Sequence, residues 1–326
     1  MVLEVIYVVR HGFRSNWDVN AATGKYKANV PSPTGIASDP ALSSYGTKQA
    51  EQLAEHLLHV QPPVDLIYSS PFYRCLQTLS PFVNKLMAKQ NGSRKVQVHV
   101  EPGLGEFYGL ARFDHPQPAT IEVLKQHFPY LHAEEPIIVP STKGESLPHL
   151  HDRIAYCLQQ IIMKADTSPA KPKALLICTH AAAMISIARA LTGMMPDDPY
   201  EDDFQCFTCS FSKFTRRRKE LEGLLSAFDN AVDHKQMRWD PNKADEVPDV
   251  QWRGGKGVAG GWNCEINADC SFLEGGEERG WRFFGDESFI HDPNAFNDRT
   301  NTNSGPPPFG QTQPLGKDIE ESRGKL

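Results

Sequence analysis

Three short apolar runs constrain the fold of this chain most strongly, because each stops at a polar turn and a helical pattern follows. The runs are residues 5–9, 64–69 and 173–179, and their β-branched and other apolar residues are typical of buried strands. Apolar residues at helical spacing follow each run. Strands that alternate with helices predict an α/β fold, a mostly parallel sheet in three layers with helices on both faces.

Other segments are less regular. Residues 96–100 and 204–214 are predicted as further strands. Residues 18–39 are rich in Gly, Pro, Asn and Ser, which favours a surface loop. Residues 110–140 show little pattern, and we expect them to form a lid or insertion over the site. Residues 143–146 are predicted to begin another helix.

Composition predicts three parts of the chain. Residues 1–225 carry the alternating strands and helices and form the main domain. Residues 226–291 are predicted to be an irregular extension that packs back on this domain through an aromatic island, Trp252 and residues 262–284. Residues 292–326 are polar and rich in Pro and Gly, and we expect them to be disordered.

Charge and cysteine content exclude some classes of protein. The net charge of −6 argues against direct nucleic-acid binding, which normally requires a basic face. Seven cysteines, an odd number, favour reduced thiols. No apolar run reaches the ~18 residues that a membrane span needs, and the stretch before Arg10 is too short for a signal peptide. We expect a soluble cytoplasmic or nuclear protein.

Cationic and imidazole side chains stand at the carboxyl ends of the predicted strands. Arg10, His11 and Arg14 follow the first strand, Arg74 begins the helix after the second, and His180 follows the run at 173–179. Because open α/β sheets bind ligands at this edge, these residues are predicted to share one site.

This set of residue types suits a phosphoryl group. Guanidinium groups donate paired hydrogen bonds to phosphate oxygens and keep their charge. A neutral imidazole can attack phosphorus, and a second can hold an oxygen as charge moves. With this much fixed positive charge, neither metal nor cofactor is required. A carboxylic acid must still protonate the leaving oxygen. Glu106 is the best placed, with Glu101 and Glu145 nearby.

Each of these residues also has a structural interpretation. A single histidine after a strand is more often structural, and a single arginine at a helix start is usually a surface charge. Only the complete set favours catalysis.

Several motifs resemble those of the histidine phosphatase superfamily, in its phosphoglycerate-mutase-like branch. They are Arg10-His11-Gly12, residues 42–50, residues 69–78, Gly144-Glu145-Ser146 and Thr179-His180-Ala181. The resemblance implies a phosphoglycerate-mutase-like fold and makes residues 1–225 a histidine phosphatase domain. It also implies that His11 accepts the phosphoryl group, that Arg74 binds phosphate and that His180 is the second histidine of the pocket.

Details within the resemblance favour a phosphatase over a phosphoglycerate-type mutase. Phe13 and Arg14 stand where the mutase pattern has Glu or Gln and then Ser or Thr. Arg14 resembles a further phosphate ligand of the protein-tyrosine-phosphatase-like members, and residues 104–107 resemble their acid block. This implies a phosphomonoesterase with a phosphohistidine intermediate, and phosphotyrosine or aryl phosphates are its candidate substrates.

Residues 10–17, 70–76 and 272–283 also resemble the phosphatase-domain subunits of the fungal transcription factor TFIIIC. This resemblance extends to about residue 285. It implies an alternative function, an interaction protein with partners of the TFIIIC type in RNA polymerase III transcription, in which the phosphatase fold is mainly a scaffold.

Overall fold

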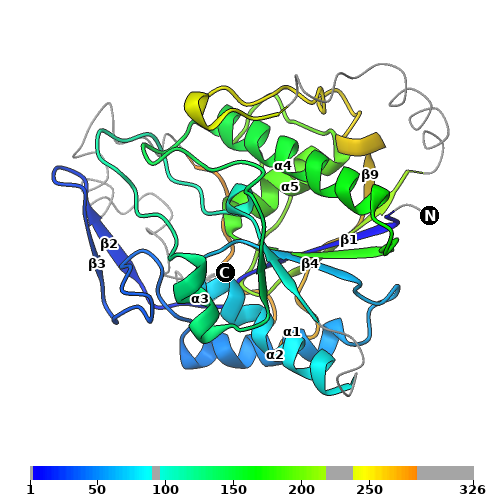
Figure 1. Cartoon of the computed structure of the whole chain (residues 1–326), viewed down its shortest axis with the longest axis horizontal. Coiled ribbons are helices and arrows are strands. Elements are labelled where there is room, and N and C mark those ends of the chain that lie inside the picture. The colour runs from blue at the N-terminus through cyan, green and yellow to red at the C-terminus, as the bar shows by residue number, and fades with distance from the viewer. Residues whose placement is uncertain (1–2, 90–95, 218–237, 285–326) are drawn as a thin grey trace, which may run out of the picture.

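A seven-stranded sheet with helices on both faces organises the molecule (Figure 1). The computed structural model describes residues 3–89, 96–217 and 238–284. The strand order is β6-β5-β4-β7-β1-β8-β9. The strands span β1 (Val5–Arg10), β4 (Leu66–Ser69), β5 (Val98–Val100), β6 (Leu131–Ala133), β7 (Ala174–Thr179), β8 (Phe211–Arg216) and β9 (Trp262–Asp269). The predicted three-layer α/β fold is confirmed.

Most of the sheet is parallel. β6, β5, β4, β7 and β1 pair in parallel, whereas β8 pairs antiparallel to β1 and β9 antiparallel to β8. Every residue of β1 and β7 is buried, as expected for central strands covered on both faces. Arg10 lies opposite Thr179 in the register of these two strands, so the residues that follow them emerge side by side.

Two pairs of helices cover the sheet. α1 (Ser44–Leu57) and α2 (Tyr73–Lys89) pack on one face, and α4 (Leu147–Thr167) and α5 (Ala181–Thr192) pack on the other (Figure 1). Serine caps begin two of them, since Ser43 accepts a hydrogen bond from the Gly46 amide and Ser146 accepts one from the His149 amide. Each layer has its own apolar core against the sheet.

The two segments expected to be irregular contain secondary structure. The predicted loop at 18–39 begins with the hairpin of β2 (Trp17–Asn20) and β3 (Lys25–Ala28), whose strands are too short and polar to stand out in the sequence. The predicted lid at 110–140 contains α3 (Ile121–His127) and β6, the edge strand of the sheet. β6 has no apolar run of its own, so only its pairing with β5 reveals it.

Residues 238–284 are more regular than predicted. They contribute strand β9, which pairs with β8, and two short 3-10 helices, Pro241–Lys243 and Val258–Gly260. Trp252 and Trp262 are fully buried in the core of the α4–α5 layer. Strand β8 begins only at Phe211, so residues 204–210 of the predicted strand are not part of it. The tail predicted at 292–326 lies outside the described residues.

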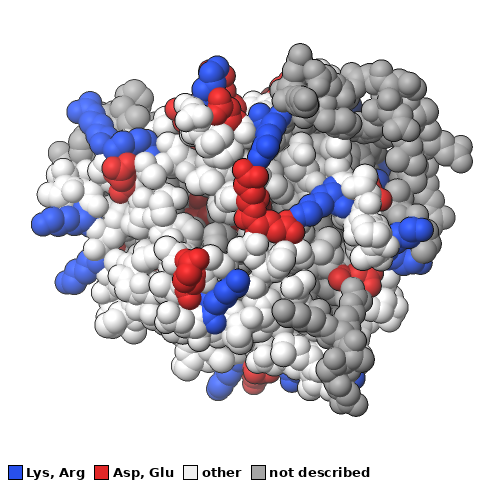
Figure 2. Space-filling view, viewed as in Figure 1, with Lys and Arg blue, Asp and Glu red and all other residues white. Residues whose placement is uncertain are grey.

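The described surface has no membrane-spanning element and no dominant charge on the face in view. No helix within the described ranges is long and apolar enough to cross a bilayer. Figure 2 shows basic and acidic side chains interspersed on one face. All seven cysteines are free thiols.

Candidate active site

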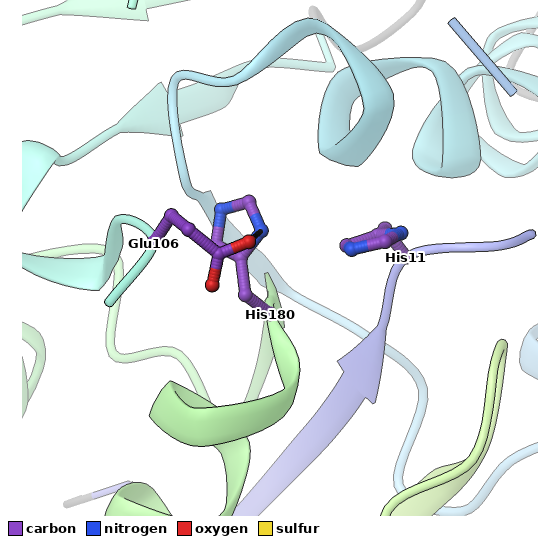
Figure 3. Close-up of side chains that lie close together, drawn as sticks. All are labelled: His11, Glu106 and His180. Carbon is purple, nitrogen blue, oxygen red and sulfur yellow. Dashed lines mark ion pairs between the residues drawn. The ribbon is translucent and has the colours of Figure 1, made fainter. Parts of the chain in front are cut away.

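Two histidines meet where the central parallel strands end. His11 directly follows β1, and His180 follows β7 as the N-cap of α5. Their ring centroids are 5.3 Å apart at an interplanar angle of 66°. Figure 3 shows His180 and Glu106 together, with His11 facing them across a gap. The strand register thus brings together two residues that are far apart in sequence.

The hydrogen bond of His11 defines its tautomer. His11 is 4% exposed, and its Nδ1 lies 2.8 Å from the carbonyl oxygen of Gly12. A carbonyl can only accept, so Nδ1 carries the proton and Nε2 keeps its lone pair. Burial lowers the pKa of His11 well below its usual value, and the positive charges of Arg74 and neighbouring groups lower it further. The ring is therefore neutral, and its unshared electron pair is on Nε2.

Side chains of α1 and α2 hold the turn that follows His11. The Gly12 amide donates to Thr78 Oγ1 at 3.0 Å, and the Phe13 amide donates to Gln49 Oε1 at 2.9 Å. A β-carbon on Gly46 would lie 1.9 Å from the Phe13 carbonyl oxygen, so only glycine permits this close approach. These contacts fix the direction in which His11 leaves the strand.

Arg74 connects the site to its supports. Its guanidinium is fully buried and donates through Nη1 to Asp39 Oδ1 at 3.1 Å. Through Nη2 it contacts Glu106 Oε2 at 2.8 Å and His180 Nδ1 at 3.1 Å. One side of the guanidinium is thus anchored on Asp39, and the other side contacts Glu106 and His180.

Glu106 lies beside His180 with an ionised carboxyl group. Its Oε2 is 3.2 Å from His180 Nδ1, and its side chain is 13% exposed. Burial alone would raise the pKa of Glu106, but His180 and Arg74 outweigh burial and hold it well below its usual value. Burial opposes protonation of His180, but Cys75 and the Glu106 carboxylate outweigh it and raise the pKa of His180.

The other two candidate acids have structural contacts away from the gap. The Glu101 carboxylate caps the 3-10 helix η1 (Pro102–Leu104) by accepting from the Gly103 amide at 2.8 Å. Glu145 pairs with Arg153, whose Nη1 donates to the Gly103 carbonyl at 2.7 Å. Both residues therefore position the loop that carries Glu106. This geometry leaves Glu106 as the acid candidate.

Arg10 and Arg14 add positive charge around His11. Arg10 Nη1 donates to the backbone carbonyl oxygen of Arg279 at 2.8 Å, so the extension reaches the site. Arg14 lies 5.6 Å from the ring centre of Trp17. Burial, together with the nearby charge of Arg74, lowers the pKa of Arg14 to about 9. Cations crowded in this way favour the binding of an anion among them.

The structure brings together every residue expected at the site, and it adds residues that the sequence reasoning missed. Asp39 anchors Arg74, Ser70 Oγ lies 2.7 Å from His180 Nε2, and the Arg279 carbonyl holds Arg10. Asp39 ends a segment without periodicity, and a backbone carbonyl leaves no signal in side-chain identity. Ser70 was the detectable one, because it follows β4 just as His180 follows β7.

The same donors could also hold a metal ion. The ligand atoms of His11, Glu106 and His180 lie within 4.8 Å of one another. Imidazole nitrogens with one carboxylate suit Zn²⁺ and related ions. Metal therefore has to be controlled in any assay of this site.

Curated proteins with similar sequences include two relatives of different kinds. The transcription factor tau 55 kDa subunit of Saccharomyces cerevisiae is 29% identical over 291 residues, which cover 87% of this chain and 59% of that protein. The ecdysteroid-phosphate phosphatase of Drosophila melanogaster is 26% identical over 214 residues, which cover 59% of this chain and 27% of that protein. This chain therefore spans less than two thirds of the length of either relative.

One solved structure and one family model complete the comparisons. The crystal structure of the ecdysone phosphate phosphatase from Bombix mori in complex with tungstate aligns with a TM-score of 0.48 and 19% identity, and the alignment covers 66% of this chain and 90% of that one. The model of the histidine phosphatase superfamily (branch 1) matches residues 6–227. With the two histidines and the arginines of that region gathered at one sheet edge, this chain belongs to branch 1 of the histidine phosphatase superfamily.

Proposed function

We propose that the protein is a metal-independent phosphomonoesterase that works through a phosphohistidine on His11, with aryl phosphates such as phosphotyrosine as its substrates. The observation that carries this proposal is the tautomer of His11. The Gly12 carbonyl holds the proton on Nδ1, and Nε2 has no hydrogen-bond partner in the described part of the chain. A neutral imidazole fixed in this way is a competent nucleophile at neutral pH.

The first step transfers the phosphoryl group to His11. Nε2 attacks phosphorus, and the bond from phosphorus to the leaving oxygen breaks. The phosphorylated imidazolium keeps its proton on Nδ1, which still donates to the Gly12 carbonyl. The equatorial oxygens of the phosphoryl group carry a negative charge that is redistributed in the transition state. They are held by Arg10, Arg14, Arg74 and His180. In the second step water attacks phosphorus, the P–N bond breaks and neutral His11 returns.

Glu106 supplies the proton in the first step and removes one from water in the second. In the unliganded site its carboxylate occupies Arg74 and His180, which are the groups that a phosphate needs. A bound dianion takes over these two partners and adds negative charge beside Glu106. Both effects raise the pKa of Glu106, so substrate binding itself prepares the acid.

Aromatic side chains next to the phosphate site support an aryl substrate. The Phe72 ring lies 5.2 Å from the His180 ring, and Tyr108 lies 6.5 Å beyond Phe72. Trp17 of β2 continues the row at 6.3 Å from Tyr108. Aromatic walls bind flat rings through offset and edge contacts.

The direct test is hydrolysis of an aryl phosphate by the wild-type chain in the presence of a chelator. We expect turnover to be unchanged after EDTA treatment, because the guanidinium groups supply the charge that a metal would supply. Added Zn²⁺ is expected to inhibit by occupying His11, Glu106 and His180. Loss of turnover in EDTA and its return with metal would contradict the metal-independent mechanism. A coupled assay with phosphoglycerates is expected to show no mutase activity.

Glu106→Gln is expected to slow substrates according to their leaving group. Without an acid, the leaving oxygen must depart as an anion, so alkyl phosphates should lose roughly 10²–10⁴-fold in kcat. An aryl phosphate with an acidic phenol should lose much less. The measurement is kcat across a series of leaving groups, with Glu122→Gln, on an exposed carboxylate of α3, as the matched variant. Uniform slowing across the series would assign the acid role elsewhere.

Activity is expected to persist well into acidic pH. The pKa of His11 lies well below 6.5, so Nε2 stays unprotonated below that pH. The acidic fall in kcat/KM should therefore have its midpoint below pH 6.5. ¹⁵N-histidine spectra of the unliganded protein measure this pKa directly, with the signal assigned by its loss in His11→Ala. Arg14→Gln removes a nearby positive charge and should raise the midpoint. A wild-type midpoint at or above 6.5 would contradict the mechanism.

A second function is supported by the extent of one similarity. The alignment with the yeast tau 55 kDa subunit covers 87% of this chain, well beyond residues 6–227 matched by the family model. We therefore propose, as the alternative, a nuclear protein that joins a complex of the TFIIIC type. Affinity purification of the tagged full chain from nuclear extract is expected to recover other TFIIIC subunits if this is correct. Recovery with both wild type and His11→Ala would indicate assembly independent of catalysis.

A further inference from the structure

A second group of metal-binding side chains lies at the edge of the sheet, away from His11 and His180. His99 is on β5 and His132 is on β6, directly opposite each other in the parallel register. Glu134 is two residues beyond His132, so it emerges on the same face. The ligand atoms of these three residues lie within 4.8 Å of one another. Two imidazoles and a carboxylate thus converge on one small space.

The spacing of the donor atoms approaches that of a coordination sphere. Glu134 Oε1 is 3.3 Å from His132 Nε2 and 3.9 Å from His99 Nδ1. Tetrahedral zinc with bonds of about 2.0–2.1 Å places neighbouring ligand atoms roughly 3.3 Å apart. Small side-chain rotations would therefore bring all three atoms within bonding distance of one ion.

One of the three donors lacks a partner. His99 Nδ1 is buried and has no hydrogen-bond partner among the residues that the structure describes. A buried polar atom without a hydrogen-bond partner is unfavourable, so this nitrogen is available to bind a ligand. The 3.9 Å between His99 Nδ1 and Glu134 Oε1 is too long for a hydrogen bond, and it is close to the separation of two atoms that bind the same metal ion.

The surroundings hold these side chains in place. The His99 ring stacks on Tyr68 at 4.9 Å and 19°, and the His132 ring meets His99 edge-on at 4.9 Å. Lys164 of α4 pairs with the second oxygen of Glu134, Oε2, which leaves Oε1 directed at the histidines. Contacts of this kind orient metal ligands in known sites. His132 and Glu134 are 39% and 38% exposed, so an ion can enter from solvent.

We propose that His99, His132 and Glu134 bind a divalent transition metal, with Zn²⁺ the best fit and water in the fourth position. Imidazole with carboxylate favours zinc over Mg²⁺ or Ca²⁺, which prefer oxygen ligands. The ion would fasten edge strand β6 to β5. The site shares no residue with the catalytic centre, so it does not depend on the proposed phosphatase activity.

The test measures zinc binding to the full chain in a His11→Ala background, which removes one donor from the catalytic centre. Equilibrium dialysis with metal analysis is expected to show one Zn²⁺ per chain at micromolar zinc. Adding His132→Ala or Glu134→Gln should weaken binding at least tenfold, whereas His149→Ala, on an exposed histidine outside the cluster, should not. Bound Co²⁺ should show the visible absorption of a nitrogen–oxygen site, and His132→Ala should remove it.

Thermal unfolding gives an independent readout. Zinc is expected to raise the Tm of the His11→Ala protein, because it binds only the folded chain, and this rise should disappear with His132→Ala. Circular dichroism checks that the exposed substitutions leave the fold intact. Absence of zinc binding, or equal binding with and without His132, would overturn the proposal.

Discussion

His11→Ala is expected to reduce kcat/KM for aryl phosphates by roughly 10⁴-fold or more, the scale seen when a covalent nucleophile is removed. The reason is geometric. His11 is the histidine of this site whose hydrogen bond to a carbonyl leaves a ring nitrogen free. His180, in contrast, has Ser70 at Nε2 and Arg74 and Glu106 at Nδ1. Binding of phosphate should survive the substitution, since the arginines remain.

The matched experiment is to trap the intermediate. Rapid quenching of the wild-type chain with a ³²P-labelled aryl phosphate should leave label on the protein that acid releases and base does not, as expected for a P–N bond. His11→Ala should carry no label, and His149→Ala should behave as wild type. Labelling that persists in His11→Ala would assign the nucleophile to another residue. Equal turnover by the wild type and His11→Ala would exclude His11 as the nucleophile.

The residues that could be predicted from the sequence are those whose position follows from a strand end. His11 and His180 follow the two most apolar runs, and parallel pairing of those runs places them together. Arg74 was predictable for the same reason, because it opens the helix after β4. Local sequence is sufficient to predict these positions, because parallel pairing places the carboxyl ends of the strands at the same edge of the sheet.

The residues that could not be predicted depend on contacts across long stretches of chain. Asp39 reaches Arg74 from an irregular segment, and the Arg279 carbonyl reaches Arg10 across 269 residues. Strand β6 illustrates the same limit, because its three residues form a strand only through pairing with β5. Periodicity in the sequence indicates which residues of one element are buried. The contacts of Asp39 and Arg279 and the formation of β6 depend instead on which distant segment packs beside them.

Arg74→Met is expected to remove activity and also to destabilise the fold by about 3–5 kcal/mol, the cost of breaking a buried ion pair. The guanidinium and Asp39 are both fully buried, and Arg74 is also bonded to Glu106. Methionine fills a similar volume but leaves the Asp39 carboxylate without its cation. Urea unfolding measures the loss. Unchanged stability would show that Asp39 finds water or another partner when the arginine is gone.

A second substitution separates the two roles of Arg74. In Arg74→Met/Asp39→Asn the buried carboxylate is gone, while the asparagine oxygen can still accept the hydrogen bond that the Tyr73 amide donates to Asp39. The double variant should regain a large part of the lost stability and remain inactive, since nothing replaces the phosphate contact.

Acid should have a similar effect on the stability of the single variant Arg74→Met. Burial already raises the pKa of Asp39, and without Arg74 the carboxyl of the folded protein protonates at higher pH than that of the unfolded chain, so the deficit should shrink as pH falls. A deficit that does not change with pH and is not rescued by Asp39→Asn would mean that Arg74 stabilises the fold through packing on Phe72, whose ring centre lies 4.7 Å from the guanidinium carbon, and not through charge.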